Sequence, residues 1–99
     1  MNERKINAYP IPLKDLFTLH LPEFAKVLTV HVDKNQPFLW AEFMKIHEPH
    51  IEIRTFRMQT AGQTWTAPPG KHLDYVGTFQ LQDPAFIGHV YEERPGVNG

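Results

Sequence analysis

The sequence predicts an all-β fold, a small antiparallel sandwich or barrel of about six to seven short strands. Nine prolines and six glycines divide the 99 residues into short segments, so no segment offers a long helical pattern. Between these breaks, apolar and polar side chains alternate with a period of two, which is typical of strands. A chain of this length has room for one core, so we expect a single domain over residues 1–99 with an ordered core of about residues 5–93.

The first half of the chain contains three predicted strands and one further candidate. Residues 6–9 form a possible edge strand. Residues 16–21 alternate, whereas residues 27–32 are apolar or β-branched at both parities, which is typical of a central strand covered on two sides. Residues 22–25 have the length of a hairpin loop, so we expect these two strands to pair. Residues 38–43 follow a polar turn and form the next strand of a hairpin.

The predicted strand at residues 51–58 contains an irregularity. Its large apolar residues change parity between Ile53 and Phe56. A β-bulge near Arg54 and Thr55, or an edge position, would explain this change. The last two strands are predicted at residues 73–81 and 86–92. Residues 94–99 are predicted to be a frayed tail.

Composition and charge exclude several classes of protein. Ten basic and eleven acidic residues give a net charge of -1, which argues against non-specific nucleic-acid binding. No stretch approaches the ~20 apolar residues of a membrane span. The first residues lack the apolar region of a signal peptide, and the chain has no cysteine, so we expect a cytoplasmic protein without disulfides.

Histidine is the one functional residue type in excess, with six in the chain. His47 and His50 are spaced so that one face of a helix would carry both, but Pro49 argues against a helix there. They are weak metal candidates, and a solvated turn is the simpler interpretation. We predict no metal and no cofactor. The absence of serine and of phosphate-binding glycine motifs favours a non-enzymatic protein.

The best binding features lie around the long irregular segment at residues 60–72. Trp65 in this loop is either an anchor for a partner or a lid over the core of the domain. Trp40, between Leu39 and Ala41, is predicted to be a core residue. His89 is predicted to be half-buried and hydrogen-bonded.

Arg54 and Arg57 flank Phe56 and face opposite sides of a regular strand. Beside aromatic residues such as Tyr75, arginines can bind a phosphate or a carboxylate. The alternative is cross-strand pairing with one of three glutamates: Glu42, Glu48 or Glu52.

Several short motifs follow one another in an order that resembles a known family. They are Tyr9-Pro10-Ile11, Leu21 to Val30, Pro37-x-Leu39-Trp40-Ala41, Glu52-x-Arg54-x-Phe56, Tyr75 to Gln80 and His89 to Glu92. Together they resemble a family of phage and bacterial proteins of about this length that is catalogued as a domain of unknown function. The resemblance covers residues 9–92. It implies a phage or prophage accessory protein that binds a host component, for example to inhibit a defence system, and it implies no catalytic residues.

We therefore expect a non-catalytic binding protein whose site contains Trp65, Arg54, Arg57 and Tyr75. The expected partner is a host protein or a small anionic ligand, with no membrane and no non-specific nucleic acid. A homodimer is possible because exposed strand edges invite pairing. Two alternatives stay open, a histidine-ligated metal-dependent hydrolase and a structural or scaffold component of the virion.

Overall fold

The computed structural model describes residues 3–96 and contains seven strands. Their bounds are β1 Arg4–Pro10, β2 Leu16–Pro22, β3 Lys26–Asp33, β4 Gln36–Met44, β5 Ile51–Thr60, β6 Lys71–Gln82 and β7 Ala85–Pro95. All paired neighbours are antiparallel, so the prediction of an all-β antiparallel fold is confirmed. Among the described residues, no helix has the length and apolar character needed to cross a membrane.

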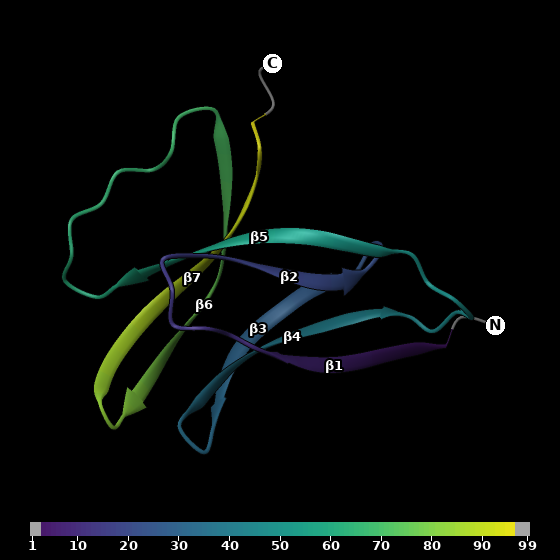
Figure 1. Cartoon of the computed structure of the whole chain (residues 1–99), viewed down its shortest axis with the longest axis horizontal. Coiled ribbons are helices and arrows are strands. Elements are labelled where there is room, and N and C mark those ends of the chain that lie inside the picture. Colours follow the sequence, from purple (N-terminus) through teal and green to yellow (C-terminus); the bar gives the residue numbers. More distant parts are fainter. Residues whose placement is uncertain (1–2, 97–99) are drawn as a thin grey trace.

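The strands form two sheets that pack as a sandwich (Figure 1). Sheet A has the order β1-β4-β3, and sheet B has the order β2-β5-β7-β6. The loop between β5 and β6 extends beyond both sheets on one side. The sheets approach closely where β3 faces β6, because a Cβ atom at Gly77 would lie only 2.9 Å from Cγ2 of Val30. Any side chain at Gly77 would therefore force the two sheets apart.

The core lies between the sheets and follows from the alternation within each strand. In β4, every second residue from Pro37 to Phe43 is buried, and the residues between them face outward. From sheet B, Phe17 and Phe56 are register partners whose rings stack with centroids 5.5 Å apart. The buried cluster comprises Ile11, Phe17, Leu21, Ala25, Val30, Leu39, Ala41, Phe43, Phe56, Met58, Phe79, Leu81 and Val90.

Two predictions for β2 and β3 are wrong. These strands do not form a hairpin, because β2 pairs with β5 in sheet B and β3 pairs with β4 in sheet A. The residues between them carry the chain from one sheet to the other, with Ala25 buried. Moreover, β3 is an edge strand. A register shift between Val27 and Thr29 accompanies an exposed Leu28, so apolar residues at both parities do not indicate two buried faces here.

The structure also corrects the prediction that Trp40 belongs to the core. Leu39 and Ala41 occupy the inward positions of β4, so Trp40 between them faces outward and is only half-buried. It lines an open hollow of about 320 Å³ together with Ile6 and Leu28.

No bulge interrupts β5 near Arg54, since its register with both neighbours is continuous. Nor is β5 an edge strand, because it lies between β2 and β7 in sheet B. Residues 51–54 pair with β2 alone, because pairing with β7 begins at Thr55. Ile53 faces outward, where it is 67% exposed, while Arg54 faces inward like Phe56, so the change of parity places Ile53 and Phe56 on opposite faces of the sheet.

The C-terminal strand continues further than predicted. Arg94 and Pro95 still belong to β7, and the N–H of Gly96 donates to the carbonyl oxygen of Gly70 at 2.8 Å. The predicted frayed tail therefore does not begin at Arg94. Residues 97–99 lie outside the described part of the chain.

The predicted hairpin between β3 and β4 is confirmed, and its turn joins the two sheets. Lys34 and Asn35 have φ values of 51° and 61°, the positive pair that a tight hairpin turn requires. The Asn35 side chain also donates to the carbonyl oxygen of Asp83 at 2.5 Å and accepts from the N–H of Gln82 at 3.0 Å. One residue thus connects the β3–β4 hairpin of sheet A to the β6–β7 hairpin of sheet B.

Asn35→Gly should lower the free energy of unfolding by about 1–2 kcal/mol, because glycine keeps the positive φ but loses both hydrogen bonds. Lys34→Gly is the matched control, since its side chain makes neither bond. In that variant, relief of backbone strain and the added flexibility of glycine oppose each other. Its free energy of unfolding should therefore lie within about 0.5 kcal/mol of that of the parent. Urea unfolding measures both, and equal losses would contradict the role assigned to Asn35.

Candidate functional site

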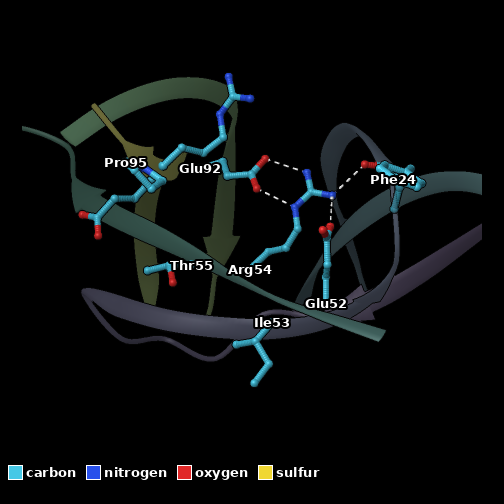
Figure 2. A pocket seen from close by; sticks show the side chains of 10 residues that line it. Phe24, Glu52, Ile53, Arg54, Thr55, Glu92 and Pro95 are labelled. Carbon is cyan, nitrogen blue, oxygen red and sulfur yellow. Dashed lines mark hydrogen bonds and ion pairs between the residues drawn. The ribbon is translucent and has the colours of Figure 1, made fainter. Parts of the chain in front are cut away.

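A largely buried ion pair connects β5 to β7 on the inner face of sheet B (Figure 2). Nε of Arg54 donates to Oε2 of Glu92 at 2.6 Å, and Nη2 donates to Oε1 at 2.8 Å, so the contact is bidentate. Nη1 donates to the carbonyl oxygen of Ala25 at 2.7 Å and lies 3.6 Å from Oε1 of Glu52. The side chains of Arg54 and Glu92 are only 17% and 8% exposed. The guanidinium therefore links β5, β7 and the connection between β2 and β3.

Strand register explains why these two residues meet. Phe56 and Glu92 are register partners on the inner face, and Arg54 follows on the same face of β5, diagonal to Glu92. Residues 51–54 of β5, which precede Thr55, do not pair with β7. An open pocket of about 560 Å³ lies at this point. Its lining comprises Phe24, Ala25, Glu52, Ile53, Arg54, Thr55, Glu92, Glu93, Arg94 and Pro95.

The ion pair keeps Arg54 charged. Hydrogen bonding to Glu92 raises the pKa of Arg54 above the ordinary arginine value, although burial opposes this effect, and the negative charges of Glu92 and Glu52 raise it further. The contribution that this raised pKa makes to folding stability is therefore fully present below the ordinary arginine pKa, a range that includes every physiological pH. Nε, Nη1 and Nη2 each have an acceptor, so an anionic ligand here would compete with Glu92 for the guanidinium and would be repelled by its carboxylate.

Three aromatic side chains meet on the outer face of sheet B, and we call Trp65, Tyr75 and Tyr91 the aromatic surface. Tyr75 and Tyr91 are register partners on β6 and β7, with ring centroids 5.5 Å apart in an edge-to-face arrangement. Trp65, from the loop of residues 61–70, lies with its ring centroid 5.5 Å from that of Tyr91. Trp65 is half-buried and Tyr75 is 59% exposed, so the aromatic surface is open to solvent.

A short chain of polar contacts borders the aromatic surface. The Thr78 hydroxyl hydrogen-bonds to the Tyr75 hydroxyl and, at 2.8 Å, to Nδ1 of His89. His89 is half-buried and hydrogen-bonded, as predicted. These contacts help to hold the Tyr75 ring in one orientation.

The structure divides the four predicted binding residues between two faces. Trp65 and Tyr75 meet at Tyr91, and Arg57 is the register partner of Tyr91 on β5. Arg54 lies on the inner face, as strand parity predicts for two arginines three positions apart. The four residues therefore do not form one site.

Both arginines have carboxylate partners on β7. Arg57 donates through Nε to Oε1 of Glu93 at 2.5 Å, as Arg54 does to Glu92. Of the glutamates named as partners from the sequence, Glu52 lies near Arg54. The main partners lie on β7: Glu92 is 38 residues after Arg54, and Glu93 is 36 residues after Arg57.

Tyr91 was missed from the sequence, and the reason is a bulge. Next to the β6–β7 turn, Gln82 is the partner of Ala85, and continuing this register would place Tyr75 opposite Glu92 on the inner face. A register shift between Tyr75 and Gly77 instead places Tyr75 opposite Tyr91 on the outer face.

Residues 2–98 match the family described as Domain of unknown function (DUF7352). The chain belongs to the DUF7352 family. No curated protein and no solved structure matches it. This membership agrees with the sequence resemblance to a family of unknown function, and it assigns no reaction or ligand. The function of this DUF7352 domain therefore has to follow from its geometry.

The histidines of the DUF7352 domain do not converge on a metal site. Within residues 3–96, no group of three or more His, Cys, Asp and Glu side chains could hold a metal ion. His47 and His50 lie exposed in the connection between β4 and β5, and the nearest carboxylate contact of His47 is Glu48 at 3.9 Å. The geometry of the described residues thus gives no support to a histidine-ligated hydrolase.

Removing one partner of the Arg54–Glu92 pair should destabilise the DUF7352 domain by roughly 3 kcal/mol, because the remaining charge is buried without its partner. Glu92→Leu and Arg54→Leu should both show this loss in denaturant unfolding. The double variant should recover more than half of it, because no unpaired charge remains beside Phe56. Arg57→Leu, which leaves this pair intact, is the control and should cost less. Additive losses in the double variant would contradict a coupled pair.

Proposed function

We propose that this chain is a non-catalytic binding protein whose partner docks on the aromatic surface. The supporting observation is the position of Trp65, Tyr75 and Tyr91 on the outer face of sheet B, outside the core cluster. Tyrosine and tryptophan dominate binding hot spots because they bury a large area with few rotatable bonds. The contacts among the three rings preorganise them, which reduces the entropy lost on binding.

A protein partner fits this surface better than a small anionic ligand. Arg57 beside the rings already binds Glu93, and Arg54 binds Glu92 on the other face. In either place, a phosphate or carboxylate would lie beside a glutamate that already neutralises the arginine and repels a second anion. Aromatic rings bordered by neutral groups such as the Thr78 hydroxyl instead resemble the composition of protein interfaces.

The sequence resemblance supports a partner from the bacterial cell. A small accessory protein encoded by a phage or prophage acts on components of its host. We therefore propose that the partner is a host protein, for example a component of a defence system, and that binding takes place in the cytoplasm.

Trp65→Ala should weaken partner binding at least about tenfold, because it removes the ring that the loop presents. The chain would be used as bait in a host lysate, the captured protein identified by mass spectrometry, and its affinity for each variant measured by calorimetry. The thermal midpoint should change little, since Trp65 lies outside the core cluster. Tyr75→Ala should behave in the same way.

Trp40→Phe supplies the matched control, because it changes a tryptophan on the outer face of sheet A and should leave binding intact. A collapse of the thermal midpoint in Trp65→Ala would show that Trp65 is a structural cover. Tight binding of nucleoside phosphates would favour the anionic-ligand alternative. Detection of the chain in purified phage particles would identify a virion component instead.

A further inference from the structure

Phe24 is the most exposed large apolar side chain among residues 3–96, at 86%. It lies in the connection between β2 and β3, and its φ of 64° is in the left-handed region. This conformation is unfavourable for a bulky side chain, because its Cβ crowds the backbone, and glycine or asparagine is the usual choice. The chain therefore has both backbone strain and an exposed aromatic ring at one position. Neither stabilises the monomer.

An open pocket of about 410 Å³ lies directly beside Phe24, and we call it the apolar pocket. Its lining comprises Arg4, Pro22, Glu23, Phe24, Met44, Ile46 and Pro49. Met44 and Ile46 are themselves exposed, so the apolar pocket offers uncovered apolar surface. It is formed where β1 begins and where β2 and β4 end. In Figure 1 these strand ends lie on the side of the molecule away from the loop of residues 61–70.

A projecting ring and a pocket on the same surface become mutually complementary when two copies are related by a two-fold axis. We propose that this chain forms a homodimer in which Phe24 of each copy enters the apolar pocket of the other. Phe24 would then contact Met44, Ile46 and Pro49 of the second copy. Burial of both rings accounts for an exposed aromatic residue that the monomer does not need.

The charges at the rim of the apolar pocket fit the same arrangement. Arg4 and Glu23 carry opposite charges, so a two-fold axis can place Arg4 of one copy beside Glu23 of the other. Arg4 lies 3.5 Å from Glu42 in its own chain but remains 54% exposed, which leaves its guanidinium accessible. The net charge of -1 adds little repulsion between copies.

The second pocket beside Phe24 is a poorer receptor for the ring. It is lined by the Arg54–Glu92 pair and by further charged groups, as Figure 2 shows. Covering these charges with an aromatic ring would remove water from them without replacing its hydrogen bonds. The apolar pocket carries two charged residues, Arg4 and Glu23, and apolar side chains make up most of the rest of its lining, so the cost there is smaller.

Sedimentation equilibrium of the purified chain over a wide concentration range tests the proposal. The parent should form a dimer, and Phe24→Gly should raise the dissociation constant at least about tenfold. Because glycine adopts a φ of 64° without strain, this variant should keep or raise the thermal midpoint at low concentration, where the monomer prevails. Loss of dimerisation then cannot be attributed to unfolding.

A charge exchange provides the second measurement. Glu23→Arg should weaken the dimer by placing two arginines together, and Arg4→Glu/Glu23→Arg should restore it. Leu13→Ala, at another exposed apolar side chain, and Trp65→Ala, on the aromatic surface, should leave the dimer intact. A monomer at all concentrations, a dimer retained by Phe24→Gly, or no restoration by the double exchange would each overturn the proposal. None of these results depends on the host partner.

Discussion

Burial of one face of each sheet in a shared core is the constraint on which the rest of the structure depends. Phe17 and Phe56 of sheet B stack within the same cluster as Leu39 of sheet A, so each strand must direct one parity inward. This requirement leaves every other side chain on an outer face. Trp40 is therefore excluded from the core by its neighbours in β4, although it is among the largest apolar residues of the chain.

The constraint separates residues that support the fold from residues that are free to bind. Arg54 faces inward and joins β5, β7 and the chain crossing near Ala25, so its charge serves the structure. Trp65 and Tyr75 face outward, where solvent reaches them and the core makes no demand on them. Phe24 belongs to neither sheet and remains exposed, which is the observation behind the proposed homodimer. The two proposed interaction surfaces thus consist of residues that the sandwich does not use.

The candidate site was predictable only in part. The length of the segment at residues 60–72 indicated that Trp65 lies in a loop, and parity separated Arg54 from Arg57 correctly. Tyr91 could not be paired with Tyr75 from the sequence, because the pairing depends on a bulge that shifts the β6–β7 register by one residue. The partners Glu92 and Glu93 were equally hidden, since they lie on a strand that is distant from β5 in the chain.

By itself, the sequence determined the all-β class, most strand positions and the β3–β4 hairpin, because alternation and turn residues are local properties. Only the tertiary structure decided that β2 joins β5 rather than β3, that β3 lies at an edge, and that Trp65 rests on Tyr91. A period of two specifies which side chains share a face of a strand. It does not specify which strand lies next to it, because that choice depends on how the two inner faces fill one core.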